Sequence, residues 1–303
     1  MLKKQSYFAL LLFGFFIVIT GLTLCGKNIH QYYFDTKSKA LYSLPAITVV
    51  IPVAPKDASL LPFVIERLKK NLQNPIYNIV ILGPKEPVIM EQANTLKVEF
   101  LDENIIYNKK FFTEAVKSIL HSKKQLLKPH DWYYQQVLKY YYANFSPTID
   151  YFVLDADIII NHPFTLKDER GYTFFRRPDE PYQKVYACAL EKLLEVKTLP
   201  YPSFVADMMI FNRVYVKSLL SIITAKSQRD FVTSIIQLEE EYCIFSEYET
   251  YGFYVTEWLV QPAHFKPSTT FKRSRKNLIE DMNNLYLTWK YPYIGYHHYM
   301  DDK

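Results

Sequence analysis

Two carboxylates one residue apart, Asp155 and Asp157, interrupt the apolar stretch IDYFVLDADIIINHPF at residues 149–164. Carboxylates are rarely buried without a partner or a metal ion, because moving an ionised group out of water is costly. If the preceding run is an extended strand, its alternation points both side chains to one side. Such a pair can hold Mg²⁺ or Mn²⁺, and that ion can bridge a diphosphate. The simpler alternative is that each Asp is a turn residue or a helix cap.

A second group of polar side chains lies in DWYYQQVLKYYYA, residues 131–143, which we expect to form a helix. Trp132, Gln135 and Lys139 share one face by their i, i+3 and i+4 spacing, and Gln136 lies beside them. Trp can stack on a base or sugar, amides can bind hydroxyls, and Lys can meet a phosphate. The alternative is an amphipathic helix with a solvated polar side.

Three further carboxylates are candidates for catalysis. Glu247 and Glu249 in FSEYETYG would share one side of a strand but diverge on a helix. One of them is a candidate general base, or a group that holds an acceptor hydroxyl. The alternative is a surface acidic pair or a helix start capped by Ser246. Asp207, a charge inside the apolar segment FVADMM, is a candidate for acceptor contact or catalysis.

The elements that would position these residues alternate in the first half of the chain. Strands are expected at 47–54, 77–84, 97–103 and 150–157, and helices at 61–72, 111–124 and 131–145. This alternation predicts a mainly parallel sheet flanked by helices, and ligands of such sheets bind outside the carboxyl ends of the strands. The second half predicts strands at 172–177 and 203–213 and helices at 214–227 and 229–242, whereas the tail from residue 262 has no clear periodicity.

Composition limits the class of protein. The 303 residues suffice for one large domain or two small ones, and the net charge of +5 is spread along the chain, so nucleic acid is not an expected partner. Cys188 and Cys243 form either a disulfide or two buried free thiols. The run 266–276, KPSTTFKRSRK, could close over a diphosphate, lie on anionic lipid, or form a solvated loop.

The N-terminus contains an uncharged 19-residue run at residues 7–25, roughly long enough as a helix to cross a bilayer. We therefore expect a membrane anchor at 1–26 and a stem at 27–45, and a cleaved signal peptide is the alternative. Lysines lie on both sides of the run, so the side of the membrane stays open.

Five stretches together resemble GT-A-fold glycosyltransferases, and more closely a family of glycosyltransferases of largely unknown substrate. They are VVIPVAPKDASLLPFVIERLKKNL (49–72), DWYYQQVLKYYYA (131–143), YFVLDADIIINHPF (151–164), SFVADMMIFNR (203–213) and FSEYETYGFYV (245–255). The resemblance implies a Rossmann-like, GT-A-like domain at 46–303 and a hexosyltransferase-like activity that takes a nucleotide-sugar donor and a glycan, lipid or protein acceptor. Met208 departs from the histidine expected near that position in such sequences.

Site residues follow from the resemblance together with the residue chemistry. Catalytic candidates are Asp207, Glu247 and Glu249, and donor-binding candidates are Pro52, Trp132, Gln135, Gln136, Lys139 and Asp155. Asp155 and Asp157 would hold Mn²⁺ or Mg²⁺, with His297, or its neighbour His298, as a third ligand, because some retaining GT-A enzymes use a C-terminal histidine. An ordinary satisfied or exposed histidine is the alternative.

Two other functions compete with the transferase. A membrane-anchored module that binds nucleotide or glycan without turnover would keep the same fold. A phosphatase-like D-x-D hydrolase is disfavoured, because its motif usually lies near the start of the domain with Thr or Val two places after the second Asp. Here the pair lies in mid-chain and Ile159 takes that place.

Overall fold

The computed structural model describes residues 44–120, 126–178, 180, 182–196, 202–268, 271–297 and 300–301. The anchor expected at 7–25 lies outside these residues, as does all of the expected stem up to residue 43. Within the described ranges, no helix combines the length and apolar character needed to cross a bilayer.

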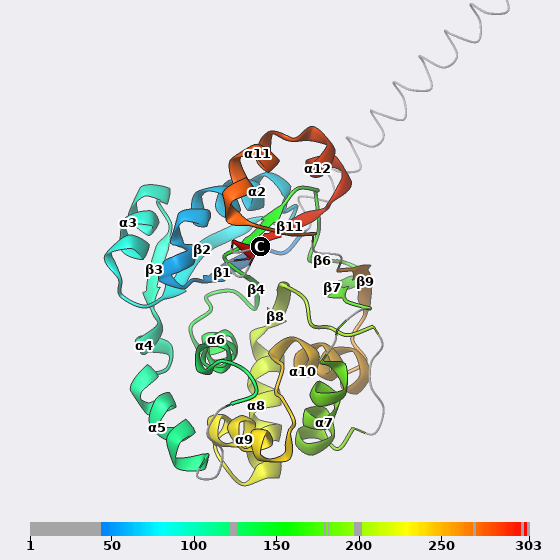
Figure 1. The fold of residues 1–303 in the computed structure, drawn as a ribbon. Helices are drawn as coiled ribbons and strands as arrows, with labels where there is room; N and C mark the ends of the chain where they lie inside the picture. Colours follow the sequence, from blue (N-terminus) through cyan, green and yellow to red (C-terminus); the bar gives the residue numbers. More distant parts are fainter. Residues whose placement is uncertain are drawn as a thin grey trace, which may run out of the picture. The chain divides into compact units, whose positions relative to one another are not determined.

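The central sheet has five strands in the order β3-β2-β1-β4-β8 (Figure 1). Strands β1 (Ile47–Pro52), β2 (Ile76–Gly83), β3 (Glu99–Asp102) and β4 (Asp150–Leu154) are parallel, and β8 (Met208–Asn212) is antiparallel to β4. All residues of β1 and β4 are buried, as is typical of strands covered on both faces. The predicted mainly parallel α/β sheet is confirmed.

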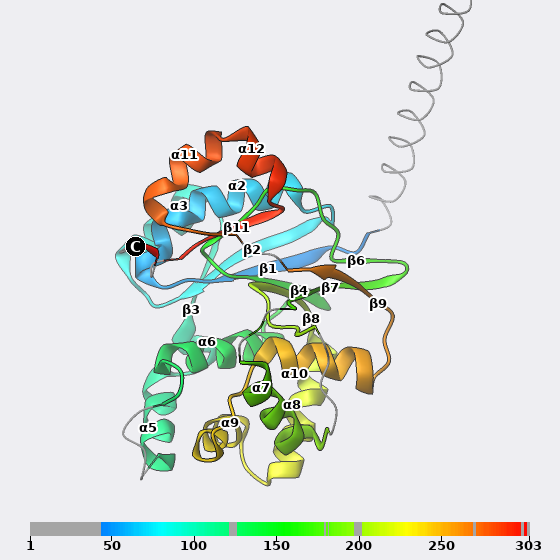
Figure 2. The same cartoon turned by 45° about the vertical axis from the view of Figure 1, so that its right-hand side comes forward.

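Helices cover both faces of this sheet (Figure 2). On one face lie α2 (Leu61–Asn71) and α3 (Pro87–Leu96), and on the other lie α6 (His130–Tyr141), α8 (Arg213–Ser227) and α10 (Glu247–Phe253). The other α-helices among the described residues before residue 260 are α4 (Glu103–Ile106), α5 (Lys109–Ile119), α7 (Gln183–Leu194) and α9 (Phe231–Gln237). A π-helical turn, Tyr254–Trp258, continues α10.

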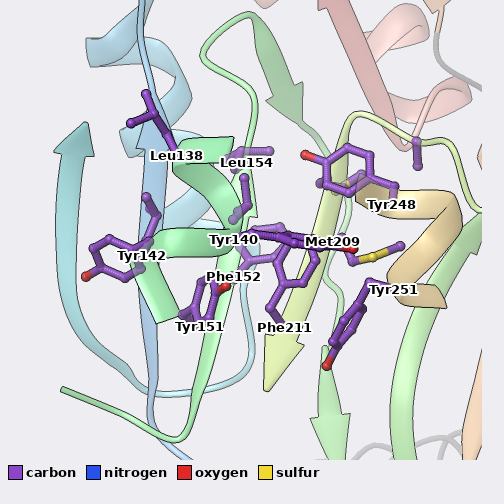
Figure 3. Packing of buried hydrophobic residues seen from close by; sticks show 14 of the residues in the cluster. Leu138, Tyr140, Tyr142, Tyr151, Phe152, Leu154, Met209, Phe211, Tyr248 and Tyr251 are labelled. Atoms are coloured by element: carbon purple, nitrogen blue, oxygen red, sulfur yellow. The ribbon is translucent and has the colours of Figure 1, made fainter. Parts of the chain in front are cut away.

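Aromatic rings fix α6 and α10 against the strands that carry the site (Figure 3). The ring of Phe211 on β8 lies 5.4 Å from that of Tyr151 on β4, 5.8 Å from Tyr140 on α6 and 4.7 Å from Tyr251 on α10. Aromatic pairs at such spacings stabilise a core beyond simple area burial. The polar residues of both helices are therefore held at defined positions over the end of β4.

A buried polar cluster lies at the opposite, N-terminal end of β4. The Asp150 carboxylate accepts hydrogen bonds from Lys167 Nζ at 2.6 Å, Asn212 Nδ2 at 2.8 Å and the Tyr172 hydroxyl at 3.1 Å. These partners come from β6 (Lys167–Asp168), β8 and β7 (Gly171–Arg176), so the start of β4 is joined to three other strands.

Two small sheets are added to the central one. The first, β10-β11-β5, comprises Phe271–Arg273, Tyr293–Tyr296 and Ile158–Ile160, and the second, β6-β7-β9, comprises Lys167–Asp168, Gly171–Arg176 and Ala263–Pro267. Helices α11 (Leu278–Asn283) and α12 (Leu285–Lys290) lie between β10 and β11. The tail from residue 262, which shows no clear periodicity in sequence, is thus built of elements too short to show one.

A disulfide between Cys188 and Cys243 joins α7 to the segment that precedes α10. Of the two states that the sequence left open for these cysteines, the structure contains the bridge.

Candidate functional site

The two carboxylates of the D-x-D sequence lie in a turn that takes the chain from one sheet to another. Strand β4 ends at Leu154 and β5 begins at Ile158, and Ile158 N donates to the Asp155 carbonyl oxygen at 3.2 Å. Asp155 N donates to the carbonyl oxygen of Asp207 at 3.1 Å, directly before β8. The strand expected at 150–157 therefore stops three residues early, and the alternation of an extended strand does not apply to the pair.

Asp155 lies against a buried cation. Lys139 Nζ on α6 is 3.0 Å from Asp155 Oδ1 and donates to Glu247 Oε1 at 2.8 Å and to the Tyr248 hydroxyl at 2.9 Å. The Lys139 side chain is 3% exposed, whereas that of Asp155 is 26% exposed. Lys139 thus faces two carboxylates inside the protein, and Asp155 is the member of the group that solvent reaches.

Asp157 lies against the C-terminal strand. Its Oδ2 is 2.8 Å from Nδ1 of His297, and its carbonyl oxygen accepts a hydrogen bond from Tyr296 N at 2.8 Å. The predicted association of His297 with the acidic turn is therefore present as a hydrogen-bonded pair across 140 residues. His298 lies outside the described residues.

The site is crowded with negative charge. Burial, reinforced by the charges of Asp157 and Asp207, raises the pKa of Asp155 to about 7 although Lys139 opposes the shift. Burial alone would lower the pKa of His297, but its hydrogen bond to Asp157 and the charges of Asp157 and Asp207 raise it above the ordinary value. The charges of Asp157 and Asp207 raise the pKa of both groups, whereas burial raises the pKa of Asp155 and lowers that of His297.

This donor set suits a hard divalent cation. Asp155 and Asp157 offer carboxylate oxygens that are about a quarter exposed, and an imidazole lies beside them. In the described parts of the chain, no three His, Cys, Asp or Glu side chains are already arranged as a metal centre. The residues fit such an ion in their chemistry, and binding would require the Asp157–His297 pair to rearrange.

The two glutamates predicted for catalysis begin helix α10 and diverge. Ser246 caps the helix, and its Oγ accepts a hydrogen bond from Glu249 N at 3.3 Å. Glu247 faces Lys139, whereas Glu249 Oε2 accepts hydrogen bonds from Ser203 Oγ at 2.5 Å and Phe204 N at 2.7 Å. Both side chains are buried, and through these contacts each connects α10 to a neighbouring segment. Asp207 is half-buried beside the acidic turn.

The predicted donor-binding residues fall into two groups. Gln136 and Pro52 are buried: Gln136 Oε1 accepts a hydrogen bond from Glu247 N at 2.9 Å, and Pro52 ends β1 next to Leu82. Trp132 and Gln135 are half-buried on α6, where the Trp132 ring packs edge-on against Tyr133. The second group is the one that a ligand could reach without displacing the core.

A pair of residues that the sequence reading missed connects the end of β1 to the tail. Asp57, in the turn after β1, forms an ion pair with Arg275, which also donates to the Lys56 carbonyl oxygen at 2.5 Å and lies 3.9 Å from Asp301. Burial raises the pKa of Asp57 despite its cationic neighbours, and Asp157 adds to that shift. Arg275 belongs to the basic run 266–276, so the sequence did mark it as a residue that could bind an anion. Nothing in the sequence identified Asp57 as its partner.

An apolar cavity of about 220 Å³ begins at Met208, one residue after Asp207. Its lining comes from β5, β7, β9 and the start of β11, with Ile160, Phe175, Lys266 and Tyr293 among the side chains. Met208, the departure noted in sequence, thus forms part of a wall of this cavity.

Residues 46–293 match the model of a family described as "Family of unknown function (DUF6492)". No curated protein matches the chain.

Among solved structures, the chain is similar to mouse xyloside xylosyltransferase 1 in its apo form, with 10% identity, a TM-score of 0.43, and coverage of 85% of this chain and 99% of that one. The galactosyltransferase LgtC, in complex with donor and acceptor sugar analogues, gives 11% identity, a TM-score of 0.43, and coverage of 82% and 87%.

The glucosyl-3-phosphoglycerate synthase of Mycobacterium tuberculosis, in complex with Mn²⁺, UDP and glucosyl-3-phosphoglycerate, gives 11% identity, a TM-score of 0.39, and coverage of 68% and 71%. At such low identity, the function of this chain is argued from its own residues.

Proposed function

The chain belongs to this family of unknown function, and we propose that it is a metal-dependent glycosyltransferase with a GT-A-like fold. It would transfer a sugar from a nucleotide-sugar donor to a hydroxyl of a glycan, lipid or protein. The observation that carries the proposal is the acidic turn of Asp155 and Asp157. It lies at the carboxyl end of β4, which is parallel to β1 and β2, and this is the edge where open α/β sheets bind ligands.

Asp155 and Asp157 would hold Mn²⁺ or Mg²⁺, and His297 would supply a ring nitrogen. When bound, such an ion neutralises charge on a departing nucleoside diphosphate. Lys139 keeps the Asp155 carboxylate oriented from beneath, because its ammonium is fixed between Asp155 and Glu247. The predicted contact of Lys139 with a donor phosphate is the weaker assignment, since that ammonium is buried.

Asp207 is the carboxylate that we assign to the acceptor hydroxyl. Asp207 is half-buried, and its carbonyl oxygen accepts a hydrogen bond from Asp155 N, so it lies next to the acidic turn. Its charge raises the pKa of both Asp155 and His297. Glu247 and Glu249 are weaker candidates for the same role, because both side chains are buried.

We place this activity at a membrane, with residues 7–25 as the anchor. The support is the length and uncharged character of that run. Carbonate extraction of membranes that carry the full chain tests this placement, and quantitative release of the protein would exclude an anchor.

The site is tested with Asp155→Asn and Asp157→Asn in the full chain held in detergent. We expect Mn²⁺-dependent binding of a nucleoside diphosphate, measured by calorimetry with UDP, GDP and CDP, to weaken roughly a hundredfold, the order seen when one well-placed electrostatic group is lost. Asp168→Asn is the matched control, because it removes the same charge from the end of β6, where Asp168 forms an ion pair with the exposed Arg170.

Unchanged affinity and unchanged metal dependence in both variants would make the acidic pair a structural turn and end the proposal. The alternative function, a module without turnover, is separated by incubating wild-type protein with a panel of nucleotide-sugars and Mn²⁺. A transferase consumes its donor slowly even without acceptor, whereas a binding module binds nucleotide and consumes none.

A further inference from the structure

Helices α11 and α12 are apolar on their outer side. Their inner residues, among them Leu278, pack against the core, but four large apolar or aromatic side chains point into solvent. The exposed fractions are 69% for Ile279, 83% for Leu285, 58% for Tyr286 and 74% for Trp289. A group of large apolar side chains on a solvent-exposed face indicates an interaction surface.

This exposure belongs to an ordered part of the fold, because both helices are tied down from below. Arg273 forms two hydrogen bonds with Asp281 of α11, at 2.8 and 2.7 Å, and the Asp281 side chain is 1% exposed. On α12, the carbonyl oxygen of Thr288 is 3.0 Å from Nε2 of His162. The helices are therefore held with their apolar side outward.

Lys290 lies beside the aromatic side chains of this surface. Between residues 272 and 290 the chain carries five Lys or Arg and two acids, and among these Arg273 pairs with Asp281 whereas Arg275 pairs with Asp57. Lys290 Nζ lies 5.3 Å from the centre of the Tyr286 ring and 5.2 Å from that of Tyr291. Aromatic rings with lysines beside them are typical of surfaces at the boundary between lipid headgroups and acyl chains.

The beginning of the folded domain lies on the same side of the molecule. The Pro45 carbonyl oxygen accepts a hydrogen bond from Asn74 Nδ2 at 3.3 Å. Asn74 lies two residues after Leu72, which forms a parallel bridge with Phe164. The same stretch, residues 161–164, contacts α12 through His162. Helices α5 and α9 lie at the opposite end of the domain (Figures 1 and 2).

The length of chain before Pro45 agrees with a nearby membrane. The apolar run ends at residue 25, which leaves residues 26–44 as a connection. Fully extended, these residues span at most about 65 Å at ~3.3–3.6 Å each. A bilayer that holds residues 7–25 is therefore within reach of α11 and α12.

We propose that the outer side of α11 and α12 docks on an anionic membrane surface. Ile279, Leu285, Tyr286 and Trp289 enter the headgroup boundary, and the exposed Lys290 meets the anionic headgroups. This surface goes beyond the proposed sugar transfer, and the choice of lipid as its partner rests on the proposed membrane anchor. It would turn the domain so that the edge carrying α11 and α12 faces the lipid, with α5 and α9 away from it.

The test uses Trp289 as its own reporter. The full chain is reconstituted in phosphatidylcholine vesicles with phosphatidylglycerol, prepared with and without brominated acyl chains, which quench only indole that reaches them. We expect quenching of the wild type to exceed that of Trp289→Phe, whose emission comes from Trp132 and Trp258 alone.

Two further variants make the test specific. In the Trp289→Phe background, Phe111→Trp places an indole on the distant α5 at a position that is also exposed, 62% against 74% for Trp289, and we expect no added quenching. Leu285→Asp keeps Trp289 but puts a charge on the surface. It should lower the ratio of docked to undocked protein about tenfold or more, the order expected when one large apolar side chain is lost from a lipid contact.

Quenching of Trp289 no greater than that of the indole at position 111 would overturn the proposal. So would emission of Trp289 that changes with protein concentration in detergent and not with brominated lipid, because the surface would then join two copies of the chain. Leu285 makes few contacts in the folded protein, so its variant is expected to melt at the wild-type temperature.

Discussion

Lys139→Met removes the one buried cation of the site while keeping an unbranched side chain of similar length. The Lys139 ammonium lies 3.0 Å from Asp155 and 2.8 Å from Glu247, and it is 3% exposed. Without it, two carboxylates face each other at the inner side of the turn. Removing one partner of a buried ion pair costs about 3–5 kcal/mol, because the remaining charge is left uncompensated. We expect a loss of that size in the free energy of unfolding, and a melting temperature lower by roughly 10 °C.

The measurement is urea unfolding of the full chain in detergent, with two controls. Lys109→Met removes a cation of the same type from an exposed pair with Asp131 at 3.0 Å, and we expect a change of about 0–1 kcal/mol. Glu247→Gln added to Lys139→Met removes one of the two stranded charges and should recover about half of the loss. If Lys139→Met is no less stable than Lys109→Met, the buried network does not stabilise the fold and its assigned role in orienting Asp155 is wrong.

Three further predictions concern the stability of the domain. Burial raises the pKa of Glu249 to about 7, so the folded chain keeps a proton that the unfolded chain releases above about 4.5, and stability from this group falls as pH rises between these values. Glu249→Gln should therefore gain on the wild type by up to about 3 kcal/mol between pH 4.5 and 8 in chemical unfolding, and parallel pH profiles would contradict this. Gly252→Ala places a Cβ 2.3 Å from the Phe204 ring, so it should cost about 1–2 kcal/mol after its gain in helix propensity, and Phe204→Leu should reduce that cost. Replacing Cys188 and Cys243 by Ser opens a loop of 55 residues and should cost about 4 kcal/mol, measured against the wild type with and without reductant.

Most elements of the first half could be predicted because they carry their own local signal, but helices α3 (Pro87–Leu96) and α4 (Glu103–Ile106) were missed. The apolar run ITVVIPVA gives β1, and the helical spacing after it gives α2 within a residue of its observed end. The secondary structure of the tail could not be predicted, for a physical reason. Helices α11 and α12 have six residues each and keep large apolar side chains on the outside, so their pattern does not separate an inner from an outer face.

At the candidate site the residue types were evident from the sequence, whereas most contacts between their side chains were not. Asp157 and His297 were placed together from residue type and resemblance, and they lie 2.8 Å apart. The partner of Lys139 could not be found in this way, because a lysine on a predicted helix suits a phosphate as well as a carboxylate. Its partners Glu247 and Tyr248 are fixed by the packing of α6 against α10, which involves residues more than a hundred positions apart.

The polar cluster around Asp150 has a consequence for the other end of its strand. A slip of β4 by one residue would turn every side chain to the opposite face, and it would take Asp150 away from Lys167 and Asn212. The loss of these hydrogen bonds would penalise a slip, which fixes the register of β4 against β8, where Asp150 pairs with Asn212. Five residues and roughly 16 Å further on, the same register brings Asp155 N to the carbonyl oxygen of Asp207. The alignment of the acidic turn is thus set from a distance, by a carboxylate that no ligand at the turn could touch.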